Sequence, residues 1–231
     1  MASGKRVGLL APMVHELEPL VRELGLEDQG DHHLGKAAHV EIVAMVTNMG
    51  IAAGGAAARR ILEHDVEHVM VVGIAGGVDH SLSVGALVVP EIVLDRATGR
   101  TFAPALVGDV EPRGIVSCGD DLVTDAATIA QWEADGVVAV EMETSGVAPV
   151  CDEAGIAWSV YRGISDFADG GLVDDGVFEM ANPDGTSDPE ALQRYLAENP
   201  ERAKVLAQLA NDMRLATDVA AAAAIRACTA V

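Results

Sequence analysis

Carboxylic acids that could move protons occur in three short segments of this 231-residue chain. The first segment ends in Glu16, the second contains Glu143, and the third contains Asp166. Each segment follows an apolar stretch typical of a β-strand. Because ligands of open α/β sheets bind at the carboxyl ends of the strands, we expect the three segments to meet in one crevice. They occupy residues 11–16, 140–144 and 162–169.

Each of these acids also has a purely structural explanation. Glu16 suits the first turn of a helix, where the helix dipole favours a negative charge. Ser165 and Asp166 could cap a helix N-terminus, and Glu141 and Glu143 could mark the entrance of another helix. The combination is more informative than any single residue, because several such signals follow one another along one predicted sheet.

The elements that must position these acids alternate along the chain. Short apolar stretches alternate with helix-like segments, which is typical of an α/β fold with a mostly parallel sheet covered by helices. Half of the residues are hydrophobic and only 3% are aromatic, so we expect a core of Val, Leu, Ile and Ala. We see no repeat and no linker, which predicts a single domain over residues 1–231.

The expected boundaries follow from the apolar stretches and from turn residues. Strands are expected at residues 7–11, 39–46, 68–72, 86–93, 113–118, 137–140 and 157–162. Helices are expected at residues 12–24, 51–62, 122–132 and 143–154, followed by a short helix capped by Ser187 and a long amphipathic helix after Pro200.

Charge and composition exclude several classes of function. The net charge is −21 and no track of Lys and Arg is present, so nucleic acid and anionic membranes are poor partners and a small molecule is favoured. The acidic stretch 163–193 lacks the spacing of a calcium loop, and no metal constellation appears. No apolar run reaches the ~20 residues of a membrane span. Three cysteines and a start without the pattern of a signal peptide favour a cytoplasmic location.

Two of the acidic segments carry specific motifs. Residues 140–144 read V-E-M-E-T, and residues 162–166 read R-G-I-S-D about twenty residues later. This pair resembles the V-E-M-E and R-x-I-S-D motifs of the methylthioadenosine/S-adenosylhomocysteine nucleosidases, within the nucleoside phosphorylase and nucleosidase superfamily. The resemblance extends over roughly residues 5–170. Further segments that match are the N-terminal loop 10–16, the loop 47–51 and the glycine-rich strand end 72–77.

The resemblance implies a mixed, twisted central sheet flanked by helices, and an enzyme that breaks the bond between a ribose and a base. This reaction builds positive charge on the sugar and negative charge on the leaving base, as glycoside hydrolysis does. By resemblance, Asp166 protonates the base, at N7 of a purine, and Glu16 takes a proton from the attacking water. We therefore expect the pocket to raise the pKa of Asp166 relative to that of Glu16.

The resemblance also implies residues that bind the nucleoside. Glu143 is expected to bind the ribose hydroxyls through charge-assisted hydrogen bonds, and Met142 to lie against the sugar. Gly76 and Val123 match positions where the backbone contacts the ligand. No organic cofactor is needed, and relatives commonly form homodimers with the pocket near the interface. From their charges alone, Arg162 and Glu141 are expected to form a structural ion pair.

Whether water or phosphate attacks remains open. Phosphorylases resemble one another in placing Arg and Ser or Thr where this chain has Val71 and Ile74, and the first loop has no Arg before Arg22. Hydrolysis is favoured, although an Arg from another segment or a partner subunit could bind phosphate. A catalytically silent nucleoside-binding protein is a second alternative. A dinucleotide site is disfavoured because residues 73–77 lack the G-x-G-x-x-G spacing, and cysteine hydrolysis because no Cys adjoins a His.

The identity of the base also remains open. Leu122 stands where nucleosidases that bind adenine carry a stacking aromatic, which weakens the case for adenine. Phe167 is the nearest aromatic in the motifs. The alternatives for the substrate are methylthioadenosine or S-adenosylhomocysteine, a different modified nucleoside, and a lipid-linked or secondary-metabolite nucleoside. His15, beside Glu16, is expected to face solvent. The acidic loop and the C-terminal helix are expected to form a lid or a dimer contact.

Overall fold

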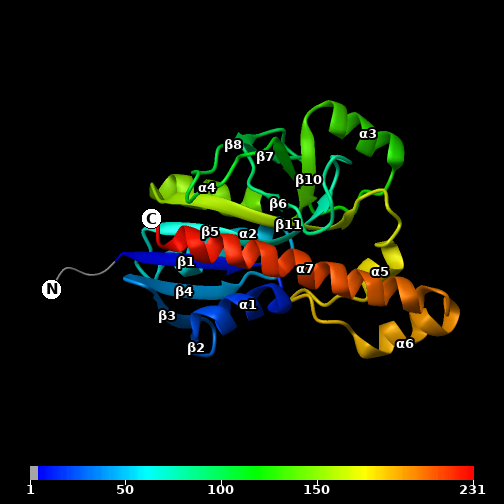
Figure 1. The fold of residues 1–231 in the computed structure, drawn as a ribbon, viewed down its shortest axis with the longest axis horizontal. Helices are drawn as coiled ribbons and strands as arrows, with labels where there is room; N and C mark the ends of the chain where they lie inside the picture. The colour runs from blue at the N-terminus through cyan, green and yellow to red at the C-terminus, as the bar shows by residue number, and fades with distance from the viewer. Residues whose placement is uncertain (1–4) are drawn as a thin grey trace.

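The computed structural model describes residues 5–231, and the strands within them form one mixed sheet, as the α/β pattern predicts (Figure 1). The strands are β1 (Arg6–Ala11), β2 (Glu27–Asp28), β3 (His33–Ala37), β4 (Val40–Val46), β5 (His68–Gly77), β6 (Leu87–Val88), β7 (Ile92–Asp95), β8 (Thr101–Phe102), β9 (Ile115–Cys118), β10 (Val137–Glu141) and β11 (Ala157–Phe167). The helices are α1 (Val14–Leu24), α2 (Ile51–Leu62), α3 (Ala126–Ala134), α4 (Thr144–Ala154), α5 (Asp175–Glu179), α6 (Pro189–Glu198) and α7 (Arg202–Cys228).

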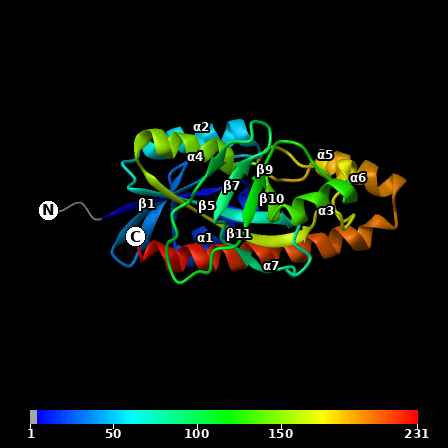
Figure 2. The ribbon, with the colours of Figure 1, turned by 90° about the horizontal axis from the view of Figure 1, so that it is seen from above.

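Helices cover both faces of the sheet (Figure 2). Successive side chains of a strand point to opposite faces, so β1 and β5 feed two separate cores. Leu9 and Met70 pack in the core that contains residues of α1 and α7. Leu10 and Val71 pack in the core that contains residues of α2 and α4. The two cores hold the middle of the sheet rigid between layers of helices.

The centre of the sheet is β5, which pairs in parallel with β1 and β11 and antiparallel with β10. The last pairing joins Val140 to Gly76, so β5 and β10 meet at their carboxyl ends. The first acidic segment follows β1, and the second lies at the end of β10. The topology therefore brings the ends of distant strands to one place.

Strands β5 and β11 are longer than the sequence predicts. We expected them to end at Val72 and Arg162, but they pair with each other as far as Gly77 and Phe167, with an irregularity before Asp166. This pairing places Ser165 and Asp166 in a strand, so the expectation that they cap a helix is wrong. The glycines near the ends of β5 and β11 are typical of loops in a sequence. These ends are strands because they pair with each other.

Other boundaries differ for local reasons. The expected strand 86–93 is divided into β6 and β7 around Pro90, which has no N–H to donate to a ladder. Helix α3 begins later than expected because Asp125 caps it by accepting a hydrogen bond from the Thr128 amide. Asp188, not Ser187, caps α6. The short elements β2, β3, β8 and α5 were not expected at all.

Candidate active site

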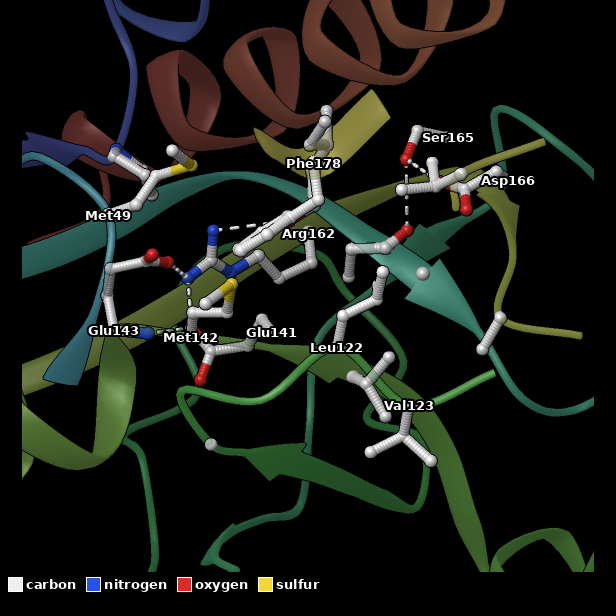
Figure 3. Close-up of a pocket in the computed structure, with 18 of the residues that line it drawn as sticks. Met49, Leu122, Val123, Glu141, Met142, Glu143, Arg162, Ser165, Asp166 and Phe178 are labelled. Carbon is white, nitrogen blue, oxygen red and sulfur yellow. Dashed lines mark hydrogen bonds and ion pairs between the residues drawn. The ribbon is translucent and has the colours of Figure 1, made fainter. Parts of the chain in front are cut away.

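A cavity of about 180 Å³ that opens to solvent lies where β1, β5, β10 and β11 end (Figure 3). The expectation that the three acidic segments meet in one crevice is confirmed. Every residue that the sequence proposed for catalysis or nucleoside binding lines this cavity. These residues are Glu16, Gly76, Val123, Met142, Glu143 and Asp166.

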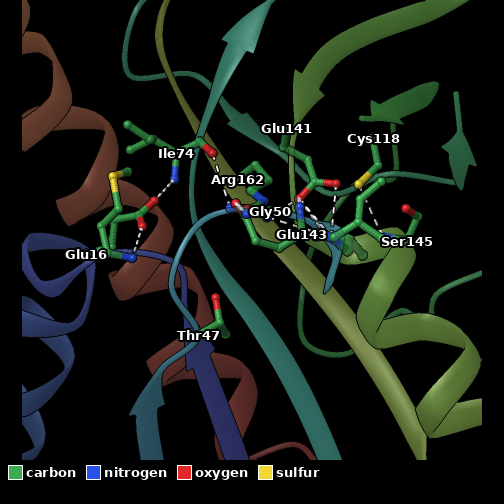
Figure 4. Close-up of polar contacts among 12 residues, drawn as sticks. Glu16, Thr47, Gly50, Ile74, Cys118, Glu141, Glu143, Ser145 and Arg162 are labelled. Carbon is green, nitrogen blue, oxygen red and sulfur yellow. Dashed lines mark hydrogen bonds and ion pairs between the residues drawn. The ribbon is translucent and has the colours of Figure 1, made fainter. Parts of the chain in front are cut away.

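Glu16 is fixed at one side of the cavity and is only 1% exposed. Its carboxylate accepts hydrogen bonds from the backbone N–H groups of Met13 and Ile74, each 2.7 Å long (Figure 4). A Cβ atom at Gly73 would overlap this carboxylate, so glycine is required for the close approach. Burial raises the pKa of Glu16 to about 8, although Arg162 opposes the shift.

Arg162 of β11 lines the cavity and binds groups from two neighbouring strands. Its guanidinium is buried and donates to Glu141, to Glu143 at 3.1 Å, and to the carbonyl oxygen of Ile74 at 3.2 Å (Figure 4). The expected ion pair between Arg162 and Glu141 is therefore confirmed. Glu141 also accepts hydrogen bonds from the backbone N–H groups of Glu143 and Thr144, each 3.0 Å long, at the start of α4.

The pKa values of the two glutamates that share Arg162 are shifted in opposite directions. Burial raises the pKa of Glu141, but Arg162 and backbone N–H groups outweigh it and hold the pKa below the usual value. Burial raises the pKa of Glu143 to about 7. The positive charge of Arg162 lowers this pKa, whereas the negative charge of Glu141 raises it further. One guanidinium thus faces three buried carboxyl groups, counting Glu16. A positive charge that develops in the cavity would be stabilised by the acids that Arg162 leaves unneutralised.

Asp166 lies away from this group and accepts a 2.5 Å hydrogen bond from the Ser165 hydroxyl. Burial raises its pKa, and Asp212 adds to the increase while Ser165 reduces it. Burial therefore raises the pKa of both acids, and the expected increase at Asp166 is accompanied by one at Glu16 that the sequence did not predict. Asp166 keeps 9% of its surface exposed against 1% for Glu16, and desolvation is the main cause at both acids.

The aromatic side chain in the cavity was not expected. Phe178 of α5 lines the cavity, as do Leu122 and Val123 (Figure 3). Phe167 does not line it; its ring stacks on His80, with centroids 5.4 Å apart. Met49 and Phe178 are apolar cavity residues that the sequence did not single out, because nothing in their local pattern marks them.

The acidic segment that carries Phe178 is bound across the first loop. The carbonyl oxygen of Asp184 accepts a 2.9 Å hydrogen bond from the Val14 amide, and that of Pro183 accepts a 2.8 Å hydrogen bond from the Met49 amide. Arg202 of α7 holds the other end by donating to the carbonyl oxygens of residues 171 and 172. Hydrogen bonds therefore fix this segment against the loops that follow β1 and β4 and against α7.

Two further side chains bear on the sequence predictions. His15 was expected to face solvent, but it is half-buried, and its Nε2 atom is buried with no hydrogen-bond partner within residues 5–231. Burial lowers its pKa. Arg96 lines the cavity, donates to the Asp121 carbonyl oxygen at 2.8 Å and lies over the Trp132 ring. Among the described residues no carboxylate lies within 4.0 Å of Arg96.

Two features are absent from the described residues. Within residues 5–231, no group of three or more His, Cys, Asp or Glu side chains is placed to hold a metal ion. No helix in the same part of the chain combines the length and apolar character that crossing a membrane requires.

Comparison with known proteins gives one family and several structural neighbours. The model of the phosphorylase superfamily matches residues 6–112 and 105–213. A 5'-methylthioadenosine/S-adenosylhomocysteine nucleosidase of Actinobacillus succinogenes is 27% identical, with 71% of this chain and 87% of that protein covered. The nucleosidase of the same name from Neisseria meningitidis, solved with methylthio-immucillin-A, has a TM-score of 0.74 at 19% identity over 98% of this chain and all of that one (100%). Futalosine hydrolase of Helicobacter pylori has a TM-score of 0.69 at 18% identity over 94% of each chain.

Proposed function

This chain belongs to the phosphorylase superfamily, and from that premise we propose that it is a nucleosidase that hydrolyses the N-ribosidic bond of a purine-type nucleoside. The observation that carries the proposal is the meeting of Glu16, Glu143 and Asp166 around one cavity. The reaction needs two acids with different tasks and a third group that holds the sugar. The three carboxyl groups come from three different parts of the sheet and could fill these roles.

In the proposed reaction, a water molecule attacks the anomeric carbon while the bond from that carbon to the base nitrogen breaks. Glu16 takes a proton from the water, and Asp166 gives a proton to the departing base, at N7 of a purine. The products are the free sugar, which keeps any group at its 5' position, and the neutral base. Proton exchange with solvent then returns both acids to their starting states, so the reaction consumes one water and no cofactor.

Charge explains how the cavity would lower the barrier. The sugar becomes positive as the bond to the base breaks, and Glu16 and Glu143 face it with Arg162 neutralising only part of their charge. In the empty cavity the pKa of Glu16 is raised to about 8, so this acid holds a proton near neutral pH. We propose that the developing positive charge favours the ionised form, which makes Glu16 a stronger base when it is needed.

Glu143, Met142, Gly76 and Val123 are proposed to bind the nucleoside. Glu143 would accept hydrogen bonds from ribose hydroxyls, and Met142 would pack against the sugar. The base would then extend toward Asp166, and the backbone at Gly76 and Val123 would contact the ligand.

Phosphorolysis is a second candidate because Arg96 lines the cavity without a carboxylate partner among the described residues. A phosphate dianion needs such a donor. Hydrolysis remains favoured because Ile74 lines the cavity where phosphorylases carry a polar residue, and Val71 is buried in the core. The two reactions differ in the sugar product, which carries a phosphate at its anomeric carbon after phosphorolysis and a hydroxyl after hydrolysis.

The base and the 5' group are proposed from the names of the relatives. Proteins named as methylthioadenosine/S-adenosylhomocysteine nucleosidases and as a futalosine hydrolase share this fold. We propose that the substrate is a nucleoside modified at the 5' position, as these names describe. Leu122 has no aromatic ring on which a base could stack, but the side chain of Phe178 supplies an aromatic face elsewhere in the cavity.

A nucleoside panel tests the proposal directly. The purified protein is incubated with 5'-methylthioadenosine, S-adenosylhomocysteine, futalosine, adenosine and inosine, with and without phosphate, and base and sugar products are separated by chromatography. We expect base release together with the unphosphorylated sugar, which keeps its 5' group, and no dependence on phosphate. A sugar 1-phosphate would favour phosphorolysis, and binding of a nucleoside without base release would favour a silent binding protein.

We further propose that residues 1–231 act as a single domain, that the protein works in the cytoplasm, and that it forms a homodimer with the cavity near the interface. Sedimentation or light scattering across a range of protein concentrations tests the dimer, and a monomer at micromolar concentration would contradict it.

A further inference from the structure

His80 lies between two carboxylates from different parts of the fold. Its Nε2 atom is 3.2 Å from Asp169, which follows β11, and its Nδ1 atom is 3.4 Å from Glu133 of α3. Its backbone N–H also donates to Glu133 at 2.9 Å. The imidazole ring lies almost parallel to the ring of Phe167, with centroids 5.4 Å apart and 16° between the planes.

These contacts connect two walls of the cavity. Asp169 and Phe167 belong to the segment that contains Asp166 and Ala168, and both of the latter line the cavity. Glu133 belongs to α3, and the loop that leads into α3 contributes Leu122 and Val123, which lie on a different side of the cavity from Asp166 in the view of Figure 3. A ring that is bound to both sides therefore sets the spacing between these two walls.

We propose that His80 is a positioning residue that, when positively charged, latches these two walls together and so controls how tightly the nucleoside is bound. The proposal rests on the proposed function, because the walls are those around Asp166. Only a doubly protonated imidazole can donate from both ring nitrogens, and both nitrogens face acceptors here. Loss of the second proton breaks one of the two links.

The charges around the ring favour the protonated form. Glu133 faces it from α3 and Asp169 from the end of β11, whereas Asp79 on its own segment is paired with Arg113 at 2.6 Å. Desolvation lowers the pKa of His80, but the two carboxylates outweigh it and raise the pKa above its usual value. The latch is therefore closed below the raised pKa of His80 and opens as the pH rises through it, which is the direction expected for a histidine that gains acidic partners.

The test compares His80→Gln, which cannot carry the charge, with His80→Lys, which keeps it, and with His39→Gln as a control at an exposed site. KM and kcat are measured from pH 6 to pH 9 with the best substrate of the panel. We expect KM of His80→Gln to exceed that of the wild type about threefold at pH 6, as for a surface ion pair, and the ratio to fall to about one at pH 9. We expect His80→Lys to bind like the wild type at pH 6 and more tightly than it at pH 9. We expect kcat to change little.

A second measurement does not depend on activity. Amide hydrogen exchange of residues 167–169 should be faster in His80→Gln than in the wild type at pH 6, after correction for the intrinsic rate, and equal at pH 9. A KM ratio near one at every pH, or a ratio that does not change with pH, would overturn the latch. If the wild type cleaves no nucleoside, the proposed function fails, and equal exchange at pH 6 then overturns the latch separately.

Discussion

The carboxylate of Glu16 accepts a 2.7 Å hydrogen bond from the backbone N–H of Ile74, which fixes the start of α1 against the middle of β5. The two residues are 58 positions apart in the chain. The side-chain carboxylate of Glu16 is therefore held at the cavity by backbone N–H groups and not by a hydrogen bond from a basic side chain. A carboxyl group that is buried and held by N–H donors is positioned before any ligand arrives, and such preorganisation is what a general base requires.

Glu16→Gln should reduce kcat by about 100-fold or more, the range typical of a lost general base. Glutamine keeps the size of the side chain but cannot take a proton, and its amide cannot accept from both Met13 and Ile74. The measurement is the rate of base release at saturating nucleoside. Glu18→Gln, at an exposed position on the same helix, serves as the control and should keep its activity. Turnover near the wild-type value in Glu16→Gln would remove Glu16 from the mechanism.

Stability should also depend on pH through Glu16. Its pKa is raised to about 8 in the folded protein, so the folded state binds a proton that the unfolded chain has lost. This stabilisation is complete below the ordinary pKa of glutamate and is lost as the pH rises through 8. Relative to Glu16→Gln, the wild type should lose on the order of 3 kcal/mol of unfolding free energy between pH 5 and pH 8. Urea denaturation at several pH values measures the difference, and a constant difference would contradict the raised pKa.

Asp166→Asn should reduce the hydrolysis of a purine nucleoside by about 100- to 10,000-fold, because asparagine cannot protonate the leaving base. A riboside with nitrophenolate as leaving group needs no such proton. The same variant should therefore cleave nitrophenyl riboside within about tenfold of the wild-type rate. Asp175→Asn, an exposed change in α5, is the matched control. Equal losses on both substrates would show that Asp166 holds the pocket together and does not act as the acid.

The sequence predicted this part of the site because polar residues at the ends of apolar strands are conspicuous. Glu16, Glu143 and Asp166 lie next to strands whose burial is evident from their composition. Phe178 gave no such signal, because it reaches the cavity only through hydrogen bonds between remote backbone groups, such as that from Met49 to Pro183. The full lengths of β5 and β11 could not be predicted for a similar reason. Their glycine-rich ends are extended because the two strands pair with each other there, and this pairing is not visible in the local sequence.

Glu143→Gln should weaken recognition of the ribose hydroxyls. The wild type should prefer a nucleoside to its 2'-deoxy analogue, because the carboxylate of Glu143 gains a charge-assisted hydrogen bond from the hydroxyl. In the variant, this preference in kcat/KM should fall about tenfold, which corresponds to about 1.4 kcal/mol. Glu153→Gln, exposed on the same helix α4, should leave the preference unchanged. An unaltered preference in Glu143→Gln would place the ribose elsewhere.

Gly73→Ala tests the close approach on which the position of Glu16 depends. The added Cβ would overlap the Glu16 carboxylate and would lie 2.8 Å from Nη1 of Arg162. Both clashes involve the ends of side chains, so the chain should still fold while the acid is pushed out of place. We expect kcat to fall about 100-fold, as expected for a misplaced catalytic group.

The stability of the double variant separates this clash from a general effect of the added methyl group. In a Glu16→Ala background the carboxylate is absent, so Gly73→Ala should cost less unfolding free energy than it does in the wild type, by about 1 kcal/mol or more. Denaturation of the wild type, the two single variants and the double variant completes the cycle. Additive effects would mean that Gly73 does not contact Glu16 in solution, and the catalytic position assigned to this acid would then lose its structural basis.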